Sequence, residues 1–313
     1  MALSVESGAK FGFICGMRDS RDARETVELA ERWGYDSVWV GDHIEFPLPL
    51  LDPFVQLSHA AAFSSKLTFG TAVYLMPLRH LVPLAKQVAS LDIMSDGRFI
   101  FGAGIGGEFP NEWAACGVPR SERGARLSEG IPLLKQLMTG ETVENPDGRF
   151  YPFDQLTLKP AAATPAGPPL WTGGRSKPAL ARCGAMADGW IGYSVTPEMY
   201  RDALTVIEAA ATEAKREIDV FGTGDLLFTQ IGDTYEEAFE SANTHLSLRY
   251  AMDFTHATKK YCALGRPEDV AARYTEFYEA GCRHFVLDLT STGKELKSQI
   301  ERFGKDVRPL LSF

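Results

Sequence analysis

One histidine of the six in the chain stands where a strand-like run ends. The apolar stretch Ser37–Val40 stops at Gly41, and Asp42 and His43 follow directly. An imidazole in this position can take or give a proton near neutral pH, which suits general acid or base chemistry. A loop histidine that bonds a neighbouring carbonyl is the alternative without chemistry, and the residue types alone leave both open.

A glycine-rich run begins at the end of another strand-like stretch, Arg98–Ala103, which is the fourth along the chain. The run Gly102-Ala-Gly-Ile-Gly-Gly-Glu108 satisfies the GxGxxG string of dinucleotide-binding folds. That motif opens the helix of a first strand-helix unit, whereas this run follows the fourth predicted strand and leads into Phe109-Pro110. Backbone amides in such a run can still approach a flat ring or an anion. A loop that needs positive φ angles is the other interpretation.

The segment Gly173-Gly-Arg-Ser176 lies between a predicted strand and a predicted helix. Free amides at the helix start, a hydroxyl group and the cations Arg175 and Lys177 would meet there. This combination predicts an anion site, because the N-terminus of a helix binds phosphate with little further help. An ordinary helix cap with solvated charges is the alternative.

Strands must place these residues together, and eight apolar runs along the chain are predicted to be strands. Most of them are followed by a stretch with helical spacing, and such alternation implies a parallel sheet. The runs are Phe11–Cys15, Ser37–Val40, Leu67–Tyr74, Arg98–Ala103, Leu170–Thr172, Trp190–Tyr193, Leu226–Ile231 and His284–Leu289.

Nine stretches carry helical spacing, and one of them, Pro267–Ala280, is an extra helix before the last strand. The others are Ala23–Trp33, Pro53–Ser64, Leu81–Met94, Arg123–Met138, Lys177–Ala187, Pro197–Lys215, Tyr235–Leu248 and Lys294–Val307. Eight strand-helix units predict a closed (β/α)8 barrel, in which active sites lie at the carboxyl ends of the strands.

An irregular region interrupts the alternation at residues 139–169. We expect a short hairpin at Gly148–Leu158 and a proline-rich loop at Lys159–Pro169. The loop could instead divide two α/β domains, but the second half would then lack a nucleotide-binding turn. We therefore favour one barrel domain over residues 1–313 with an insertion at 139–169.

Composition excludes several classes of function. With 45% hydrophobic and 23% charged residues the chain is of globular type, and a net charge of −9 argues against nucleic acid as a partner. No apolar run reaches the length of a membrane span, and the polar start lacks the features of a signal peptide, so we expect a cytoplasmic protein without a membrane partner. Five scattered cysteines, without CxxC or HxxxH pairs, predict neither a disulfide frame nor a zinc site.

Several motifs resemble, in the same order and across nearly the whole chain, those of the bacterial luciferase-like oxidoreductases. The matching segments are Tyr35–His43, Leu67–Pro77, Leu91–Gly104, Glu122–Arg126, Leu170–Gly174 and Ala187–Trp190. The resemblance implies a (β/α)8 barrel that binds FMN or the 5-deazaflavin coenzyme F420. It also implies activity as a monooxygenase or as a hydride-transferring dehydrogenase or reductase.

The resemblance assigns site residues, with His43 and Glu108 as the catalytic pair, although an extra glycine before Glu108 shifts its register. It further implies a cis peptide bond at Ala72–Val73 that brings backbone against the central ring of the coenzyme. The residues carried over as coenzyme contacts are Asp42, Ala72, Val73, Gly106, Gly107, Asn111, Gly173, Gly174 and Arg175.

Three hypotheses remain at this point. Asp42-His43 and the lack of a long insertion favour an F420-dependent oxidoreductase that acts on a small organic substrate. The second hypothesis is an FMN monooxygenase supplied by a partner flavin reductase, and the third is a coenzyme carrier or sensor without chemistry. The resemblance allows a homodimer, and the loops 44–52 and 139–169, where specificity would lie, do not identify the substrate.

Overall fold

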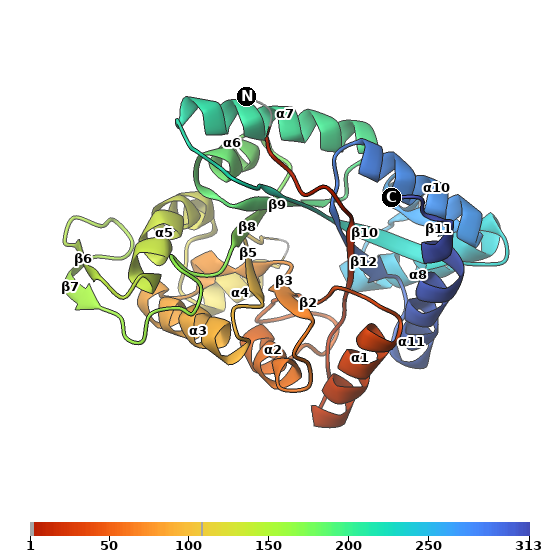
Figure 1. The fold of residues 1–313 in the computed structure, drawn as a ribbon, viewed down its shortest axis with the longest axis horizontal. Coiled ribbons are helices and arrows are strands. Elements are labelled where there is room, and N and C mark those ends of the chain that lie inside the picture. Colours follow the sequence, from red (N-terminus) through yellow and green to blue (C-terminus); the bar gives the residue numbers. More distant parts are fainter. Residues whose placement is uncertain (1–2, 108) are drawn as a thin grey trace.

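The computed structural model describes residues 3–107 and 109–313, and its core is a closed barrel of parallel strands (Figure 1). The ring closes because β1 pairs with both β2 and β12, and β10 pairs with both β12 and β9. The predicted (β/α)8 barrel is confirmed. In ring order its strands are β1 (Lys10–Ile14), β2 (Ser37–Val40), β3 (Thr68–Thr71), β5 (Phe99–Gly104), β8 (Leu170–Gly173), β9 (Gly189–Tyr193), β10 (Gly222–Ile231) and β12 (His284–Leu289).

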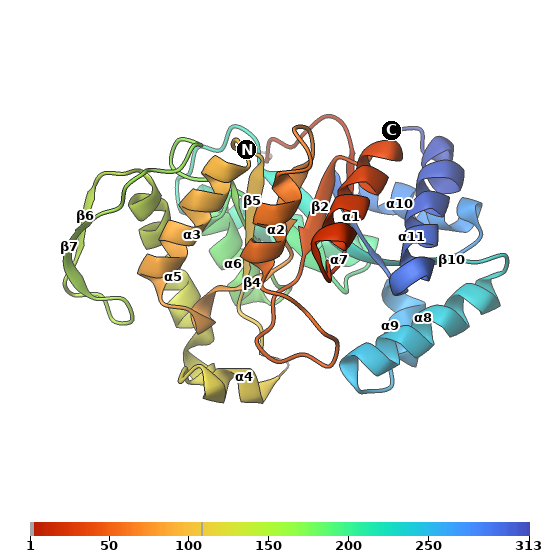
Figure 2. The ribbon, with the colours of Figure 1, turned by 90° about the horizontal axis from the view of Figure 1, so that it is seen from below.

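Helices cover the outside of the barrel (Figures 1 and 2). Side-chain caps fix several of their starts; Asp52, for example, accepts bonds from the amides of Phe54 and Val55. The helices are α1 (Ser20–Arg32), α2 (Pro53–Ala61), α3 (Leu81–Met94), α4 (Pro110–Ala115), α5 (Arg123–Met138), α6 (Lys177–Met186), α7 (Pro197–Glu213), α8 (Tyr235–Tyr250), α9 (Thr255–Tyr261), α10 (Pro267–Glu279) and α11 (Gly293–Arg302). Within the described ranges, no helix is long and apolar enough to cross a membrane.

Large side chains fill the interior of the barrel. The rings of Trp39 and Trp171 lie 5.7 Å apart between their centroids. Other strands of the barrel make room for them with glycine, since a Cβ on Gly70 would come within 2.2 Å of the Trp39 ring and one on Gly222 within 2.2 Å of the Trp171 ring. The barrel is therefore a packed core, and a ligand must bind at one of its ends.

His284, which begins β12, belongs to this core. Its Nε2 lies 2.7 Å from Oγ of Ser37, and that hydroxyl also accepts a bond from Nε1 of Trp39. Burial lowers the pKa of His284 to about 3, so the imidazole is neutral at physiological pH. His284 therefore serves packing rather than chemistry.

The predicted third strand, Leu67–Tyr74, is divided in the structure. The peptide bond between Ala72 and Val73 is cis, as the resemblance implied, and it separates β3 from the short β4 (Tyr74–Leu75). The apolar run is continuous across the break, so hydrophobic patterning alone predicts one strand. β4 pairs with the end of β5 and so returns to the rim of the barrel.

The insertion is confirmed as a hairpin, but its predicted bounds were wrong. β6 (Thr142–Asn145) pairs antiparallel with β7 (Phe153–Thr157), so Gly148–Leu158 contained only the turn and the second strand. The residues of β6 and β7 are mostly exposed and lack the alternation of a half-buried strand. Patterning also missed α4, α9 and β11 (Ala263–Gly265), which are short.

A buried carboxyl group lies beneath the helices, and one of its oxygens has no hydrogen-bond partner among the described residues. Asp225 precedes Leu226, whose side chain lies in the barrel interior, so strand alternation turns Asp225 outward toward the helical layer. Oδ1 of Asp225 has no hydrogen-bond partner in the described part of the chain, and a Cβ on Gly192, its neighbour across β9, would come within 2.4 Å of it. Burial raises the pKa of Asp225 well above its ordinary value.

Replacing Asp225 by asparagine is expected to increase stability relative to wild type as the pH rises. Above about pH 4 the unfolded chain ionises at Asp225 while the folded chain keeps the proton, so the wild-type free energy of unfolding declines by at most about 1.4 kcal/mol per pH unit. Asparagine does not titrate and lacks this decline. Thermal unfolding at pH 5 and pH 8 checks it: the Tm difference between variant and wild type should be larger at pH 8. Equal differences would mean that Asp225 is not held protonated.

Candidate active site

His43 is paired with a buried carboxylate at the carboxyl end of the barrel. Its Nδ1 lies 3.1 Å from Oε1 of Glu112, which comes from α4. The Glu112 side chain is fully buried, at 0% exposure, whereas 19% of the His43 side chain is exposed. The predicted catalytic acid, Glu108, lies outside the described residues. Glu112, four residues further along, is the carboxylate that the structure brings to His43.

Glu112 also fixes the loop that carries His43. Its Oε2 accepts a bond of 2.9 Å from the amide of Ile44. Since a carboxylate only accepts hydrogen bonds, Nδ1 of His43 must donate, and the proton of the neutral ring then resides on Nδ1. Nε2 has no partner among the described residues. The unshared electron pair on Nε2 is therefore free to receive a proton from a ligand.

Two phenylalanines hold the imidazole ring. Phe46 stacks on His43 with 4.5 Å between ring centroids and 9° between the planes. Phe109 meets the same ring edge-on at 5.2 Å and 89°. The ring is thus oriented by a hydrogen bond on one nitrogen and by apolar side chains on its face and edge. An apolar surrounding also strengthens any electrostatic interaction made there.

Asp42 faces into the protein. Its Oδ2 accepts a bond of 2.8 Å from the amide of Leu75, and its Oδ1 lies 2.7 Å from Nη2 of Arg79. Arg79 in turn stacks over the ring of Tyr74 at 4.5 Å. Burial raises the pKa of Asp42, and the Arg79 guanidinium opposes that rise. The carboxylate ties the end of β2 to β4, and its predicted role as a coenzyme contact remains a prediction.

Val73, after the cis bond, brings three predicted segments together. A Cβ on Gly104, at the end of β5, would come within 2.2 Å of Cγ2 of Val73. A Cβ on Gly173, at the end of β8, would lie 3.2 Å from Cγ1 of the same side chain. A side chain would clash with Val73 at Gly104 and would be tight against it at Gly173, so glycine lets the ends of β5 and β8 lie close to this residue. Three predicted segments therefore share one end of the barrel. They are Ala72–Val73, the glycine loop after β5 (Gly106 and Gly107) and the predicted phosphate turn (Gly173–Ser176).

The glycine loop has the backbone conformation that its sequence suggested. Gly106 has φ +53° and Gly107 has φ +126°, values that favour glycine. Asn111, in the first turn of α4, is exposed at the same rim. These residues remain predicted coenzyme contacts.

The predicted phosphate turn, Gly173–Ser176, leads from β8 into α6. Gly174 has φ +105°, and Ser176, the N-cap residue, makes no side-chain bond to the first turn. The first-turn amides are therefore not capped by Ser176 and remain a suitable site for an anion. Arg175 donates through Nη1 to the carbonyl of Ser194 and lies over the ring of Tyr261, 5.5 Å from its centroid. Among the described residues, Nε and Nη2 of Arg175 have no hydrogen-bond partner, so they stay available to a ligand.

A second polar cluster lies at the ends of β9, β12 and α8. Nη1 of Arg249 donates to both oxygens of Asp288, at 2.9 and 2.7 Å, and the hydroxyls of Tyr193 and Tyr250 share a hydrogen bond. Nη2 of Arg249 lies 3.0 Å from Nε2 of His245. Burial, followed by the charge of Arg249, lowers the pKa of His245 to about 4, so this imidazole is neutral. Tyr193 and Asp288 stand at strand ends that the sequence indicates, but nothing in the sequence singles out Arg249 or Tyr250.

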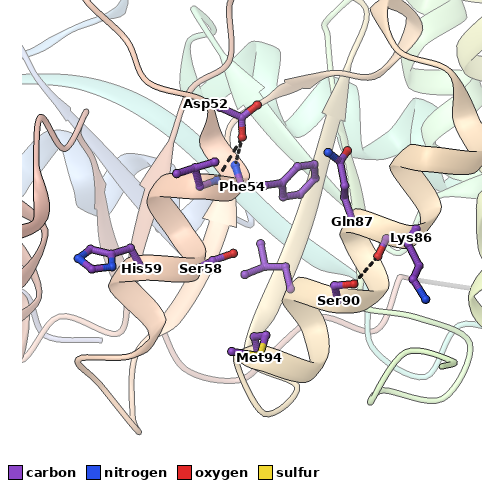
Figure 3. Close-up of a pocket in the computed structure, with 10 residues that line it drawn as sticks. Asp52, Phe54, Ser58, His59, Lys86, Gln87, Ser90 and Met94 are labelled. Carbon is purple, nitrogen blue, oxygen red and sulfur yellow. Dashed lines mark hydrogen bonds between the residues drawn. The ribbon is translucent and has the colours of Figure 1, made fainter. Parts of the chain in front are cut away.

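A groove of about 590 Å³ lies elsewhere, between α2 and α3 on the outside of the barrel (Figure 3). Its lining includes Val55 and Met94, and Asp52 caps α2 at one end. No predicted site residue lines it. Among the residues that the structure describes, no group of three His, Cys, Asp or Glu side chains could hold a metal ion. The candidate site is therefore the rim around His43, where the loop after β2 meets α4.

Comparisons with known proteins agree with this fold. The family model described as luciferase-like monooxygenase matches residues 7–284, so the chain belongs to this family, whose members are oxidoreductases. The F420-dependent glucose-6-phosphate dehydrogenase of Nakamurella multipartita is 25% identical over 311 residues, which cover 90% of each chain. The oxygenase component of the flavin-dependent trigonelline monooxygenase of Acinetobacter baylyi is 30% identical over 153 residues, 48% of this chain and 42% of that protein.

The fold also matches solved structures. An F420-dependent secondary alcohol dehydrogenase, solved with an F420-acetone adduct, superposes with a TM-score of 0.84 at 19% identity. The match covers 96% of this chain and 99% of that one. At this identity the likeness shows the fold alone.

Proposed function

We propose that the protein is an oxidoreductase that uses coenzyme F420 to transfer a hydride to or from a small organic substrate. The observation that carries the proposal is the His43–Glu112 pair, which leaves Nε2 of the imidazole free beside apolar rings. Hydride transfer at a carbinol or carbonyl carbon needs a coupled proton transfer, and this nitrogen can supply it. The aligned F420-dependent dehydrogenase supports the choice of coenzyme.

The residues at the rim fit a flat coenzyme that carries a phosphate. The uncapped start of α6 and the Gly173–Ser176 turn would hold the phosphate. Gly106 and Gly107 and the backbone at Ala72–Val73 would lie along the ring system. When bound, the deazaflavin accepts or donates a hydride at its C5 carbon.

The chain's own groups then handle the proton. In the oxidising direction the hydroxyl bond of a carbinol breaks, and Nε2 of His43 accepts its proton as the carbon loses a hydride and the carbonyl forms. Glu112 stabilises the imidazolium that results, because its carboxylate already faces Nδ1. Phe46 and Phe109 hold the orientation of the ring. In the reducing direction the same nitrogen returns the proton.

Titration of the purified protein with F420 and with FMN tests the choice of coenzyme. We expect the Kd for F420 to be at least about tenfold lower, a difference of roughly 1.4 kcal/mol. Tighter binding of FMN, with oxygen consumption by the reduced flavin, would overturn the proposal. That outcome would favour a flavin monooxygenase with a partner reductase, as the aligned trigonelline monooxygenase component suggests.

Replacing Arg175 by alanine is expected to weaken binding of the coenzyme roughly tenfold to a hundredfold, the range for a hydrogen bond to a charged group. The guanidinium stands in the turn before α6, where the phosphate is predicted to bind. Fluorescence titration at low and moderate salt measures the change, with Arg21→Ala, an exposed arginine on α1, as the charge control. Unchanged affinity in Arg175→Ala would place the phosphate elsewhere.

The partners proposed for the protein are a small organic substrate and a second copy of the chain. Light scattering on the purified protein checks the homodimer, which would have twice the mass of the 34.4 kDa chain. A mass that stays at that of one chain over a range of concentrations would exclude it.

A further inference from the structure

A second set of side chains faces the carboxyl end of the barrel interior, across from His43. Tyr193 comes two residues after Ile191, which lies in the interior, so strand alternation turns Tyr193 inward as well, one layer closer to the carboxyl ends. Asp288 follows the interior residue Val286 in the same way. β9 is the fourth strand from β2 in both directions around the ring. Tyr193 therefore stands opposite the strand that leads to His43.

Helix α8 brings two more side chains to this place. Nη1 of Arg249 donates to both oxygens of Asp288, at 2.9 and 2.7 Å, and the hydroxyl of Tyr250 shares a hydrogen bond with that of Tyr193. α8 and α4, the helix whose carboxylate pairs with His43, both lie along the lower side of the barrel in Figure 2. The two hydroxyls are therefore at the same end of the barrel as the imidazole.

Aromatic contacts fix the positions of the two hydroxyls. The ring of Tyr250 stacks on Phe254 with 4.9 Å between centroids and 16° between the planes, and the ring of Tyr193 lies 5.3 Å from that of Phe228. Burial raises the pKa of Tyr193 well above its ordinary value and also raises that of Tyr250. Both hydroxyls therefore keep their protons at physiological pH.

One of the two hydroxyl protons has no acceptor in the described part of the chain. Each tyrosine hydroxyl carries one proton, and the bond that Tyr193 and Tyr250 share uses only one of them. Arg249 interacts with Tyr250, but a guanidinium has only donors and cannot accept the other proton. Both tyrosines are half-buried, and a donor in such a place without an acceptor favours an oxygen atom from a ligand.

The charges of this cluster cancel. Arg249 and Asp288 contribute one charge of each sign and are bonded to each other. Nη2 of Arg249 lies 3.0 Å from Nε2 of His245, and burial, followed by the charge of Arg249, lowers the pKa of His245 to about 4. The imidazole is therefore neutral, and the described residues of the cluster have no net charge. An uncharged oxygen fits there better than a carboxylate or a phosphate, which would lack a counter-charge.

We propose that the hydroxyls of Tyr193 and Tyr250 bind a second, uncharged oxygen of the substrate, so that the preferred substrate is a diol or a hydroxyketone. The inference rests on the proposed function, in which the reacting carbinol or carbonyl lies at Nε2 of His43. The second oxygen accepts the unused tyrosine proton on the opposite side of the barrel end. A simple alcohol leaves this proton unpaired and so binds less well.

The test compares the turnover of matched alcohols with oxidised F420. One set holds secondary alcohols with a single hydroxyl, and the other holds the corresponding diols, with the second hydroxyl at increasing separations. In wild type, kcat/KM of the best diol should exceed that of its mono-alcohol at least about tenfold, the effect of one hydrogen bond in a partly buried site. A hydroxy acid of the same length should be a poorer substrate than the diol, because its carboxylate finds no counter-charge.

The double variant Tyr193→Phe/Tyr250→Phe removes both hydroxyls, since loss of one alone would free the other. Phenylalanine keeps the aromatic contacts, so the variant is expected to fold, and the ratio of diol to mono-alcohol should fall to about threefold or less. Tyr235→Phe/Tyr278→Phe is the matched control. Tyr235 is exposed at the start of α8, and the hydroxyl of Tyr278 bonds the carbonyl of Ser7. The control should keep the wild-type ratio.

Equal turnover of diols and mono-alcohols by wild type would overturn the inference and leave the proposed function standing, and this comparison needs no variant. A wild-type ratio that persists in the double variant would overturn it too, as would a preference for the hydroxy acid. Failure of every alcohol, diol and hydroxy acid to reduce F420, together with failure of the matching carbonyl compounds to oxidise reduced F420, would instead overturn the proposed function, and the inference with it.

Discussion

His43→Ala is expected to lower turnover about a hundred- to ten-thousand-fold while the affinity for the coenzyme changes little. The imidazole is the group at this rim whose Nε2 is free, since Glu112 occupies Nδ1 at 3.1 Å. Removing it leaves no group in its place to take the proton, whereas the predicted coenzyme contacts are spread over other strands. Steady-state rates and a coenzyme titration on the same preparation separate the two effects.

The pH profile of turnover distinguishes a proton-transfer role from a positional one. Wild-type turnover should depend on pH through a general acid-base group, and that dependence should be lost in His43→Ala. His59→Ala serves as a control for loss of a histidine, because His59 lies on α2 and bonds Ser20. Full turnover in His43→Ala on an accepted substrate would assign His43 to structure alone.

Glu112→Gln is expected to lower turnover about a hundredfold to a thousandfold with a small effect on stability. Glutamine keeps the shape and an oxygen to accept the bond from the amide of Ile44. Its amide nitrogen would then face Nδ1 and donate to it, which forces the ring proton onto Nε2. The neutral imidazole could no longer accept a proton there, so Glu112 acts as a positioning residue for His43.

In Glu112→Gln the dependence of turnover on pH should also change, because Glu112 contacts the group that moves the proton. Loss of a residue with a purely structural role would not change it. Glu129→Gln is the matched control, because Glu129 also lies on a helix and accepts bonds from loop amides, those of Phe150 and Tyr151. Both variants should show similar melting temperatures, and only Glu112→Gln should lose turnover. Equal turnover in the two would remove Glu112 from the proton-transfer pathway.

Much of the barrel could be predicted from the sequence, because each strand is a short apolar run that ends before a helical stretch. His43 could be found on the same basis, since its strand ends at Val40 and active sites lie at such ends. The division of the third strand could not be predicted from patterning, and the cis bond came from the family resemblance.

The partner of His43 could not be found from spacing. Glu112 lies 69 residues further along the chain, on a helix of six residues that is too short to show a helical period. The pair Arg249–Asp288 is similar, because the end of α8 meets β12 only when the barrel closes. Such contacts arise from tertiary structure, and the residues that form them have no common motif.

The most direct test of the proposed function is a single-turnover reaction of the purified protein with oxidised F420 and a panel of secondary alcohols. We predict loss of the visible absorbance of the deazaflavin and formation of the matching ketone in equal amounts, with a rate that falls about a hundredfold or more in His43→Ala. Retention of the absorbance with every alcohol, together with no oxidation of reduced F420 by the corresponding ketones and other carbonyl compounds, would contradict it.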